Sequence, residues 1–344
     1  MIPSEIRHGM LTVLEPQAMY PDTVLEQEVL GPNVRILHGG APPDTELSLL
    51  PDAVCAEVDG LFIFRHWLRA ADIARFPRLK VVVRMGVGYD RLDRATLAER
   101  QVVVCNVPDY GTMEVADHAI AMALTLRRGL LLHHEALRNA APWRHLDSPL
   151  IQRPQTRTFG IIGLGRIGTA VALRAKAFGW RVVFFDPHLP NGVDRALGIE
   201  RARGLPELLR QTDTLSLHTP LTRATSGMIG AAELALLPEG AIVVNTSRGP
   251  VVDIEALHDA LRSGRLAGAG LDVLPVEPPV AAVPRLFAAY RAREPWLDGR
   301  LVITPHSAFH TPEAWADIRR KSAETMRDVL VDGLRSNVIR PNDD

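Results

Sequence analysis

The sequence predicts an α/β protein with two doubly wound domains, each built on a parallel sheet. Its 344 residues are too many for one ordinary core, since a domain usually holds about 100–200 residues. Short apolar runs rich in β-branched residues alternate with helical patterns along most of the chain, as in βαβ units. Each run is apolar throughout, which is typical of strands buried on both faces of a parallel sheet.

Composition and charge exclude several other classes of protein. Hydrophobic residues make up 47% and charged residues 23%, which argues against a disordered or fibrous chain. The net charge of −1 attracts neither nucleic acid nor an anionic membrane. No apolar run approaches the roughly 18 residues of a membrane span, and the first residues do not resemble an export signal. Because Cys55 and Cys105 cannot form a disulfide framework, we expect both to be buried in a cytoplasmic protein.

Five apolar runs in the first third predict the strands of the first domain. They cover 11–14, 34–37, 61–64, 81–83 and 102–104. A helical pattern over 90–100 precedes the last run, which indicates a parallel crossover connection.

A long helix rich in Ala and Leu is expected over 113–139, and a polar stretch follows it through residue 157. The change of pattern near this helix marks the start of a second domain. Six further runs, together with the helices between them, predict a dinucleotide-binding sheet: 159–162, 182–185, 214–217, 242–244, 270–273 and 302–304.

The end of the chain predicts a return to the first domain. Thr311 is a probable N-cap with Pro312 at the first helical position, and the helix runs to about residue 330. Since the second sheet is complete before it, we expect a discontinuous domain of residues 1–107 and 312–344 around a domain of residues 108–311. The Pro-rich segment 278–300 is expected to be a surface excursion without an assigned role.

The strongest local motif is the glycine turn Gly163-Leu164-Gly165-Arg166-Ile167-Gly168, which follows the predicted strand 159–162 and opens a helix. Gly163 permits the tight turn, Gly165 lets backbone approach a pyrophosphate, and Gly168 lets the helix pack on the strand. This context predicts a dinucleotide site. The alternative is a glycine-rich turn without a ligand.

An acidic residue ends the next predicted strand. Asp186 lies 18 residues after Gly168, where a carboxylate can bind both ribose hydroxyls and would repel a 2′-phosphate. Positions 187–190 contain neither Arg nor Lys. The sequence therefore predicts a preference for NAD over NADP.

Three more chemical groups follow the predicted strands of the second sheet. Arg248 can clamp a carboxylate in fork geometry, His306 can exchange a proton near neutral pH, and Glu277 can hold that imidazole. Taken singly, each residue has another explanation: Arg248 as part of a salt bridge, His306 as a cap or core histidine, and Glu277 as a solvated acid. Their joint occurrence at strand ends favours an active site, because ligands of open α/β sheets bind there.

The glycine turn and Asp186, followed in order by Arg248, Glu277 and His306, resemble the D-isomer-specific 2-hydroxyacid dehydrogenase family over nearly the whole chain. The resemblance implies a Rossmann NAD-binding domain and a flavodoxin-like substrate domain. Residues 170–179, with Asp186-Pro187 and Gly192-Val193, look most similar to the C-terminal binding protein branch, whose animal members are NAD-binding corepressors. Phe309 and Pro220 stand where those corepressors carry tryptophan and glycine, so the corepressor role is not carried over.

The resemblance also implies residue roles. Arg248 would bind the substrate carboxylate and polarise its carbonyl, His306 would be the acid/base and Glu277 its partner. Further substrate contacts would come from Val87, Gly88 and Phe309. Asp272 would hold the nicotinamide carboxamide, and the full set expected to contact the cofactor is Thr112, Gly163, Gly165, Arg166, Ile167, Gly168, Asp186, His218, Thr219, Pro220, Thr225, Thr246, Ser247 and Asp272.

We therefore expect an NAD-dependent oxidoreductase that moves a hydride between nicotinamide and a small 2-oxo or D-2-hydroxy acid, without a metal. The resemblance implies a homodimer formed through the region of the 113–139 helix. The balanced charge argues against nucleic acid or a membrane as a partner. Two alternatives remain open. One is an NAD(H)-sensing binding protein similar to the corepressors, and the other is a phosphite-type oxyanion dehydrogenase.

Overall fold

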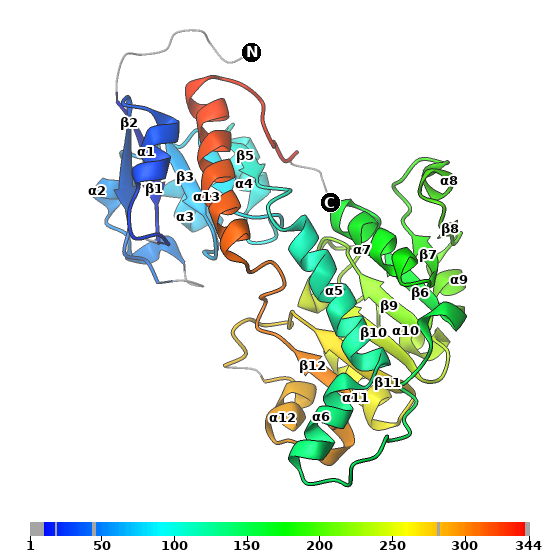
Figure 1. Ribbon diagram of the computed structural model, residues 1–344. Helices are drawn as coiled ribbons and strands as arrows, with labels where there is room; N and C mark the ends of the chain where they lie inside the picture. Colours follow the sequence, from blue (N-terminus) through cyan, green and yellow to red (C-terminus); the bar gives the residue numbers. More distant parts are fainter. Residues whose placement is uncertain (1–9, 18, 43–45, 281–282, 341–344) are drawn as a thin grey trace. The chain divides into compact units, whose positions relative to one another are not determined.

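A computed structural model describes residues 10–17, 19–42, 46–280 and 283–340, and the chain divides into two compact units (Figure 1). Unit 1 comprises residues 1–110 and 311–344, and unit 2 runs from Gly111 to His310. The sequence predicted that the chain passes from one domain to the other at 107/108 and again at 311/312. Among the described residues, every helix is too short or too polar to cross a bilayer.

Unit 1 contains a five-stranded parallel sheet in the order β2-β1-β3-β4-β5. All five predicted strands are present: β1 (Leu11–Glu15), β2 (Val34–His38), β3 (Gly60–Ile63), β4 (Val81–Arg84) and β5 (Val103–Asn106). The helices are α1 (Val24–Leu30), α2 (Asp52–Cys55), α3 (Ala70–Ala74) and α4 (Arg94–Glu99), with a 3-10 turn at Leu47–Leu49. The helix expected over 90–100 is shorter, because the Asp93 carboxylate caps it by accepting a hydrogen bond from the Thr96 amide.

The C-terminal helix α13 (Pro312–Met326) belongs to unit 1 and continues into a π-helical turn, Arg327–Val331. The Thr311 hydroxyl accepts a hydrogen bond from the Ala314 amide at 3.0 Å, so this residue is the N-cap that the sequence predicted. The helix packs against α1, β4 and β5. Gly60 permits this packing, since a Cβ there would lie 2.7 Å from the Met326 sulfur.

Unit 2 contains a seven-stranded parallel sheet in the order β12-β11-β10-β9-β6-β7-β8. The strands are β6 (Thr158–Ile162), β7 (Arg181–Phe185), β8 (Glu200–Arg201), β9 (Thr214–Leu217), β10 (Ala241–Asn245), β11 (Leu266–Leu271) and β12 (Leu301–Ile303). The two-residue edge strand β8 was missed. Strand β11 begins earlier than predicted, because Gly268 and Gly270 weaken its apolar pattern where the sheet meets α5, the helix that opens unit 2.

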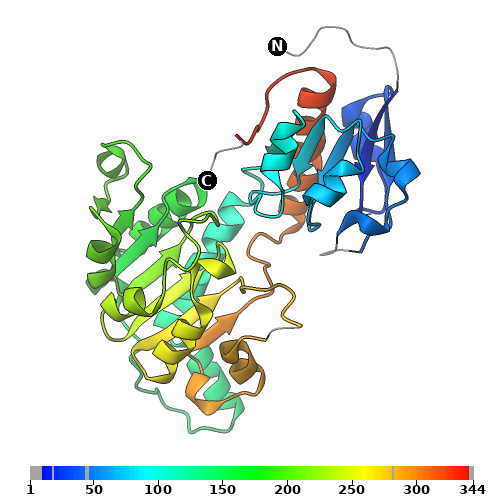
Figure 2. The same ribbon diagram turned by 180° about the vertical axis from the view of Figure 1, so that it is seen from behind.

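Helices cover both faces of this sheet. One face carries α5 (Thr112–Arg127) and α7 (Arg166–Ala177), which lie together in front of the sheet in Figure 1. The other face, turned forward in Figure 2, carries α9 (Leu205–Arg210), α10 (Ala231–Leu236) and α11 (Ile254–Arg262). The remaining elements are α6 (Leu130–Arg138), α8 (Val193–Leu197), α12 (Arg285–Arg291), and 3-10 turns at Pro154–Thr156, Gly249–Val251 and Pro295–Leu297.

Two expectations for unit 2 are wrong. The helix expected over 113–139 is two helices, because Gly129 adopts a left-handed conformation with φ 60° that ends α5 and begins α6. The segment 278–300 is not a mere surface excursion. It contains α12, and its Leu286 and Leu297 are buried in the core beneath α11.

Candidate active site

The glycine turn joins β6 to α7 with the geometry that a dinucleotide needs. Gly163 has φ 83°, and a Cβ on Gly168 would lie 2.1 Å from the Gly163 carbonyl oxygen. Both positions therefore require glycine. By contrast, a Cβ on Gly165 would meet nothing within 4 Å, so space above the turn is open at the N-terminus of α7, which Arg166 and Ile167 begin.

Asp186 lies directly after β7 beside this turn. Its carboxylate accepts hydrogen bonds from the Leu164 amide and the His188 amide, both at 2.9 Å. These two bonds orient the carboxylate at the end of the strand. A carboxylate in this place suits the ribose hydroxyls of a dinucleotide.

Two hydroxyls near the strand ends are buried without a hydrogen-bond partner in the described part of the chain. They belong to Thr219, after β9, and Thr246, after β10. Buried hydroxyls normally have partners, so these atoms fit a polar ligand such as a nicotinamide cofactor. Burial lowers the pKa of His218, which directly precedes Thr219, to about 3, and its Nε2 lies 2.8 Å from the Ser216 hydroxyl. His218 is therefore neutral at physiological pH.

Hydrogen bonds within the loops arrange several other predicted cofactor residues. The Thr225 hydroxyl donates to the Pro220 carbonyl at 2.7 Å, which closes the loop after β9. The Ser247 hydroxyl donates to the Asn245 side chain at 2.8 Å. Thr112 is the first residue of α5.

The three predicted catalytic residues follow three adjacent strands, β10, β11 and β12, at their carboxyl ends. His306 Nδ1 lies 2.6 Å from Glu277 Oε2, and the other oxygen of Glu277 accepts the Leu274 amide at 2.8 Å. Burial raises the pKa of Glu277, but the hydrogen bond and charge of His306, the Leu274 amide and the charge of Arg248 together lower it below its ordinary value. Glu277 is therefore an ionised carboxylate that holds His306 by Nδ1 and leaves Nε2 for chemistry.

The backbone passes unusually close to itself beside Arg248. A Cβ on Gly249 would lie 2.0 Å from the Leu274 carbonyl carbon, so only glycine lets the loop with Glu277 approach Arg248. The Asn245 side-chain amide donates to the Arg248 carbonyl at 2.9 Å. The Arg248 Nη1 donates to the Ser247 carbonyl at 2.8 Å, and this hydrogen bond orients the guanidinium.

The loop with His306 has further neighbours. His306 itself has φ 53°, a left-handed conformation that costs a residue with a side chain about 1–3 kcal/mol. The Asp272 carboxylate accepts hydrogen bonds from the Ser307 and Ala308 amides at 2.8 and 3.0 Å. The ring of Phe309 lies edge-on to the His306 ring, with centroids 6.4 Å apart.

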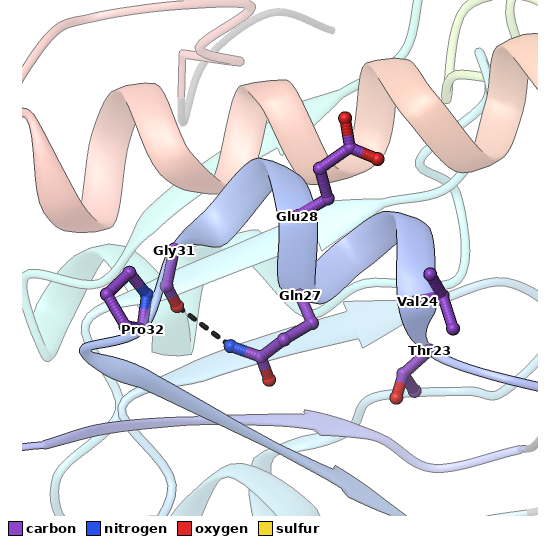
Figure 3. Close-up of a pocket in the computed structure, with 6 residues that line it drawn as sticks. All are labelled: Thr23, Val24, Gln27, Glu28, Gly31 and Pro32. Carbon is purple, nitrogen blue, oxygen red and sulfur yellow. Dashed lines mark hydrogen bonds between the residues drawn. The ribbon is translucent and has the colours of Figure 1, made fainter.

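In unit 1, Val87 and Gly88 follow β4 at its carboxyl end. The Asn106 side-chain amide donates to the Val87 carbonyl at 2.8 Å and shapes this loop. A separate hollow of about 660 Å³ beside α1 contains none of the predicted site residues, as Figure 3 shows; it is lined by Thr23, Val24, Gln27, Glu28, Gly31 and Pro32.

Sequence reasoning missed two residues that contact the site. His118 on α5 and Thr304 after β12 are hydrogen-bonded at 3.0 Å, and Thr304 also donates to Asp272 at 2.6 Å. His118 lies within an apolar helical pattern, so only its position beside the end of β12 identifies it. No group of three or more metal-ligating side chains occurs among the residues that the structure describes.

Comparison with known proteins identifies the family. The profile described as "D-isomer specific 2-hydroxyacid dehydrogenase, NAD binding domain" matches residues 120–308. A glyoxylate reductase of Korarchaeum cryptofilum is 35% identical over 302 residues, which are 87% of this chain and 82% of the relative. This chain belongs to the D-isomer specific 2-hydroxyacid dehydrogenase family. It is therefore an oxidoreductase of the class that interconverts 2-hydroxy and 2-oxo acids with a nicotinamide cofactor.

Other members of the family share the fold of this chain, and two of them were solved with different cofactors and acids. The D-3-phosphoglycerate dehydrogenase of Methanocaldococcus jannaschii is 35% identical over 272 residues, 78% of this chain, but the chain spans only 49% of that protein. The D-lactate dehydrogenase of Aquifex aeolicus, solved with NAD and lactic acid, has a TM-score of 0.82, 26% identity and coverage of 95% of this chain and 98% of its own. An NADPH-dependent glyoxylate/hydroxypyruvate reductase of Sinorhizobium meliloti, solved with NADP and malonate, has a TM-score of 0.81, 29% identity and coverage of 97% and 98%.

Comparison with these 2-hydroxyacid dehydrogenases corrects the expected place of this chain within the family. They are phosphoglycerate, glyoxylate and lactate enzymes, and they do not support the assignment of this chain to the C-terminal binding protein branch. They also include both NAD and NADP complexes, so family membership alone leaves the choice of cofactor open.

Proposed function

We propose that this chain is an NAD-dependent reductase of small 2-oxo acids that forms D-2-hydroxy acids, with Arg248, Glu277 and His306 as its catalytic residues. The observation that carries the proposal is the 2.6 Å contact between His306 Nδ1 and Glu277, with the Arg248 charge acting on the same carboxylate. A proton donor, a carboxylate that holds it and a guanidinium that binds an anionic substrate suit the reduction of a 2-oxo acid.

Each group has a distinct task in this proposal. Arg248 binds the substrate carboxylate in fork geometry and polarises the carbonyl. His306 gives a proton from Nε2 to the carbonyl oxygen, a step that contributes about 10²- to 10⁴-fold. Glu277 stabilises the imidazolium before this transfer. The nicotinamide cofactor, when bound, supplies the hydride that reaches the substrate carbon.

The cofactor preference rests on Asp186. Its carboxylate is oriented by two backbone amides at the end of β7, and a 2′-phosphate in that place would meet negative charge. We therefore infer that NAD is preferred to NADP. The glycine turn, Thr219, Thr246 and Ser247 are proposed to line the same cofactor, and Phe309 to line the substrate pocket beside His306.

The test is oxidation of NADH with a panel of glyoxylate, hydroxypyruvate, pyruvate, phenylpyruvate and branched 2-oxo acids, with phosphite and NAD run in parallel. His306→Gln should lower turnover by about 10²-fold or more, because Gln cannot donate the proton. His145→Gln, at an exposed position in unit 2, is the control and should keep full activity. Activity with phosphite alone, or NADH binding without any turnover, would replace this proposal by the oxyanion dehydrogenase or the NAD(H) sensor.

We also infer that the protein is a homodimer formed around α5 and α6. Large apolar side chains are exposed there, with Leu130 at 59% and Trp143 at 92% exposure. Exposed apolar side chains of this size are a feature of interfaces between protein chains. Light scattering at several concentrations should give twice the chain mass, and Leu130→Ser with Trp143→Ser should shift it toward one chain. Since Cys55 and Cys105 are buried free thiols, a reducing compartment such as the cytoplasm remains our expectation.

A further inference from the structure

The backbone that presents His306 is strained and depends on one acid. His306 is in the left-handed region, which a residue with a side chain occupies only where its surroundings hold it. The Asp272 carbonyl accepts the His306 amide at 2.8 Å, and the Asp272 carboxylate accepts the next two amides at 2.8 and 3.0 Å. The position of the Asp272 carboxylate therefore sets the position of residues 306–308.

A second side chain holds the same carboxylate, through the oxygen that also accepts the Ser307 amide. The Thr304 hydroxyl donates to Asp272 Oδ1 at 2.6 Å, and its oxygen lies 3.0 Å from His118 Nε2. Since the single hydroxyl proton is directed at the carboxylate, the Thr304 oxygen must accept from His118. His118 consequently carries a proton on Nε2, and that nitrogen is also 3.9 Å from Asp272 Oδ1.

We propose that His118 is a positioning residue for the acid/base His306. Through Thr304 it holds the Asp272 carboxylate, which is only 2% exposed, and Asp272 in turn holds the 306–308 backbone. The chain of contacts joins α5 to the end of β12, across 186 residues of sequence. The inference rests on the proposed function, because His306 needs positioning only if it transfers a proton.

The kinetic test compares a variant that loses the donor with one that keeps it. His118→Leu should lower kcat about tenfold or more and raise the KM for NADH by a smaller factor, since Asp272 is expected to contact the nicotinamide while Asp186 and the glycine turn are untouched. His118→Gln retains an N–H donor and should recover kcat to within threefold. Thr304→Val should behave as His118→Leu does, and the double variant should be no slower than either single variant, because both break one chain of contacts.

A second readout does not depend on turnover. In the protein without cofactor, the Nδ1 proton of His306 bonded to Glu277 should give a low-field NMR signal, assigned by its loss in His306→Gln. His118→Leu and Thr304→Val should shift or broaden this signal, whereas His118→Gln and the control His134→Leu on α6 should leave it in place.

Several results would overturn the proposal. An unshifted signal together with normal kcat in His118→Leu would exclude the positioning role, as would equal losses in His118→Leu and His118→Gln or additive losses with Thr304→Val. If no 2-oxo acid is reduced but the signal moves as expected, the proposed function fails while the contact between His118 and the His306 loop stands.

Discussion

Arg248 supplies chemistry that no other basic side chain can replace. Its guanidinium is planar and presents parallel donors to a carboxylate, whereas a lysine ammonium is a point charge. We expect Arg248→Lys to lower kcat/KM by about 10²-fold or more for any 2-oxo acid that is a substrate. Arg203→Lys, at an exposed position after β8, is the matched control. A rate near that of the parent enzyme would remove Arg248 from the proposed role.

A second residue-scale prediction concerns the cofactor. Asp186→Ala removes the carboxylate that the Leu164 and His188 amides orient. NADH should bind more weakly, because the ribose hydroxyls lose their acceptor, and NADPH should bind more strongly, because repulsion of its 2′-phosphate is lost. Titration of both cofactors by fluorescence measures the ratio of dissociation constants. Asp194→Ala on α8 should leave that ratio unchanged, and an unchanged ratio in Asp186→Ala would contradict the assignment.

At the scale of elements, one buried side chain attaches α5 to the sheet of unit 2. Arg127 is 1% exposed and donates to the Thr214 hydroxyl, the Gly240 carbonyl and the Asp213 carbonyl. Burial lowers the pKa of Arg127 to about 10, so it remains charged at physiological pH. Its hydrogen bonds hold the helix that carries His118.

Arg127→Met should therefore destabilise unit 2 by about 2–4 kcal/mol, because buried acceptors would lose their donor. The measurement is hydrogen exchange of backbone amides in β9 and β10 under conditions where exchange follows unfolding. Arg128→Met changes the exposed neighbour and should have an effect within about 0.5 kcal/mol. Equal exchange rates in the two variants would show that the Arg127 hydrogen bonds contribute little.

Elements with a buried apolar pattern could be predicted from sequence, and elements held by single contacts could not. Strand β9 is buried on both faces and was placed at its observed bounds, 214–217. The break at Gly129 lies inside a continuous Leu-rich pattern, which predicts one uninterrupted helix. Helix α12 follows a Pro-rich segment, which is typical of a loop, so the local sequence did not predict this helix.

The same distinction applies to the site. Arg248, Glu277 and His306 could be predicted because their side-chain chemistry is specific and each follows a strand. The role of His118 depends on a contact with Thr304, far away in the chain, and a helical pattern contains no signal for it.

For the molecule as a whole, Glu15 makes stability depend on pH. It ends β1 at 3% exposure, and burial raises its pKa from 4.5 to about 7; the Glu26 charge adds to this, while the Met19 amide and Arg319 oppose it. A carboxyl whose pKa is higher in the folded state stabilises the protein fully below pH 4.5, and this stabilisation is lost as pH rises to about 7.

The wild-type protein should therefore lose about 3 kcal/mol of unfolding free energy from this group between these pH values. Glu15→Gln, which stays neutral, should flatten the dependence and be more stable than the parent at pH near 8. Urea unfolding of unit 1 at several pH values measures how its free energy of unfolding depends on pH. Glu28→Gln, at an exposed position on α1, is the control. Parallel pH curves for Glu15→Gln and the parent would contradict the prediction.

The discontinuity of unit 1 has a consequence for biosynthesis. Helix α13 packs against β4 and β5, yet the 200 residues from Gly111 to His310 are translated before it. At about 5–20 residues per second, a ribosome needs roughly 10–40 s for that interval. During this time the nascent N-terminal sheet lacks α13, and the apolar surface that this helix covers is exposed. We therefore expect the growing chain to be prone to aggregation until α13 has been translated.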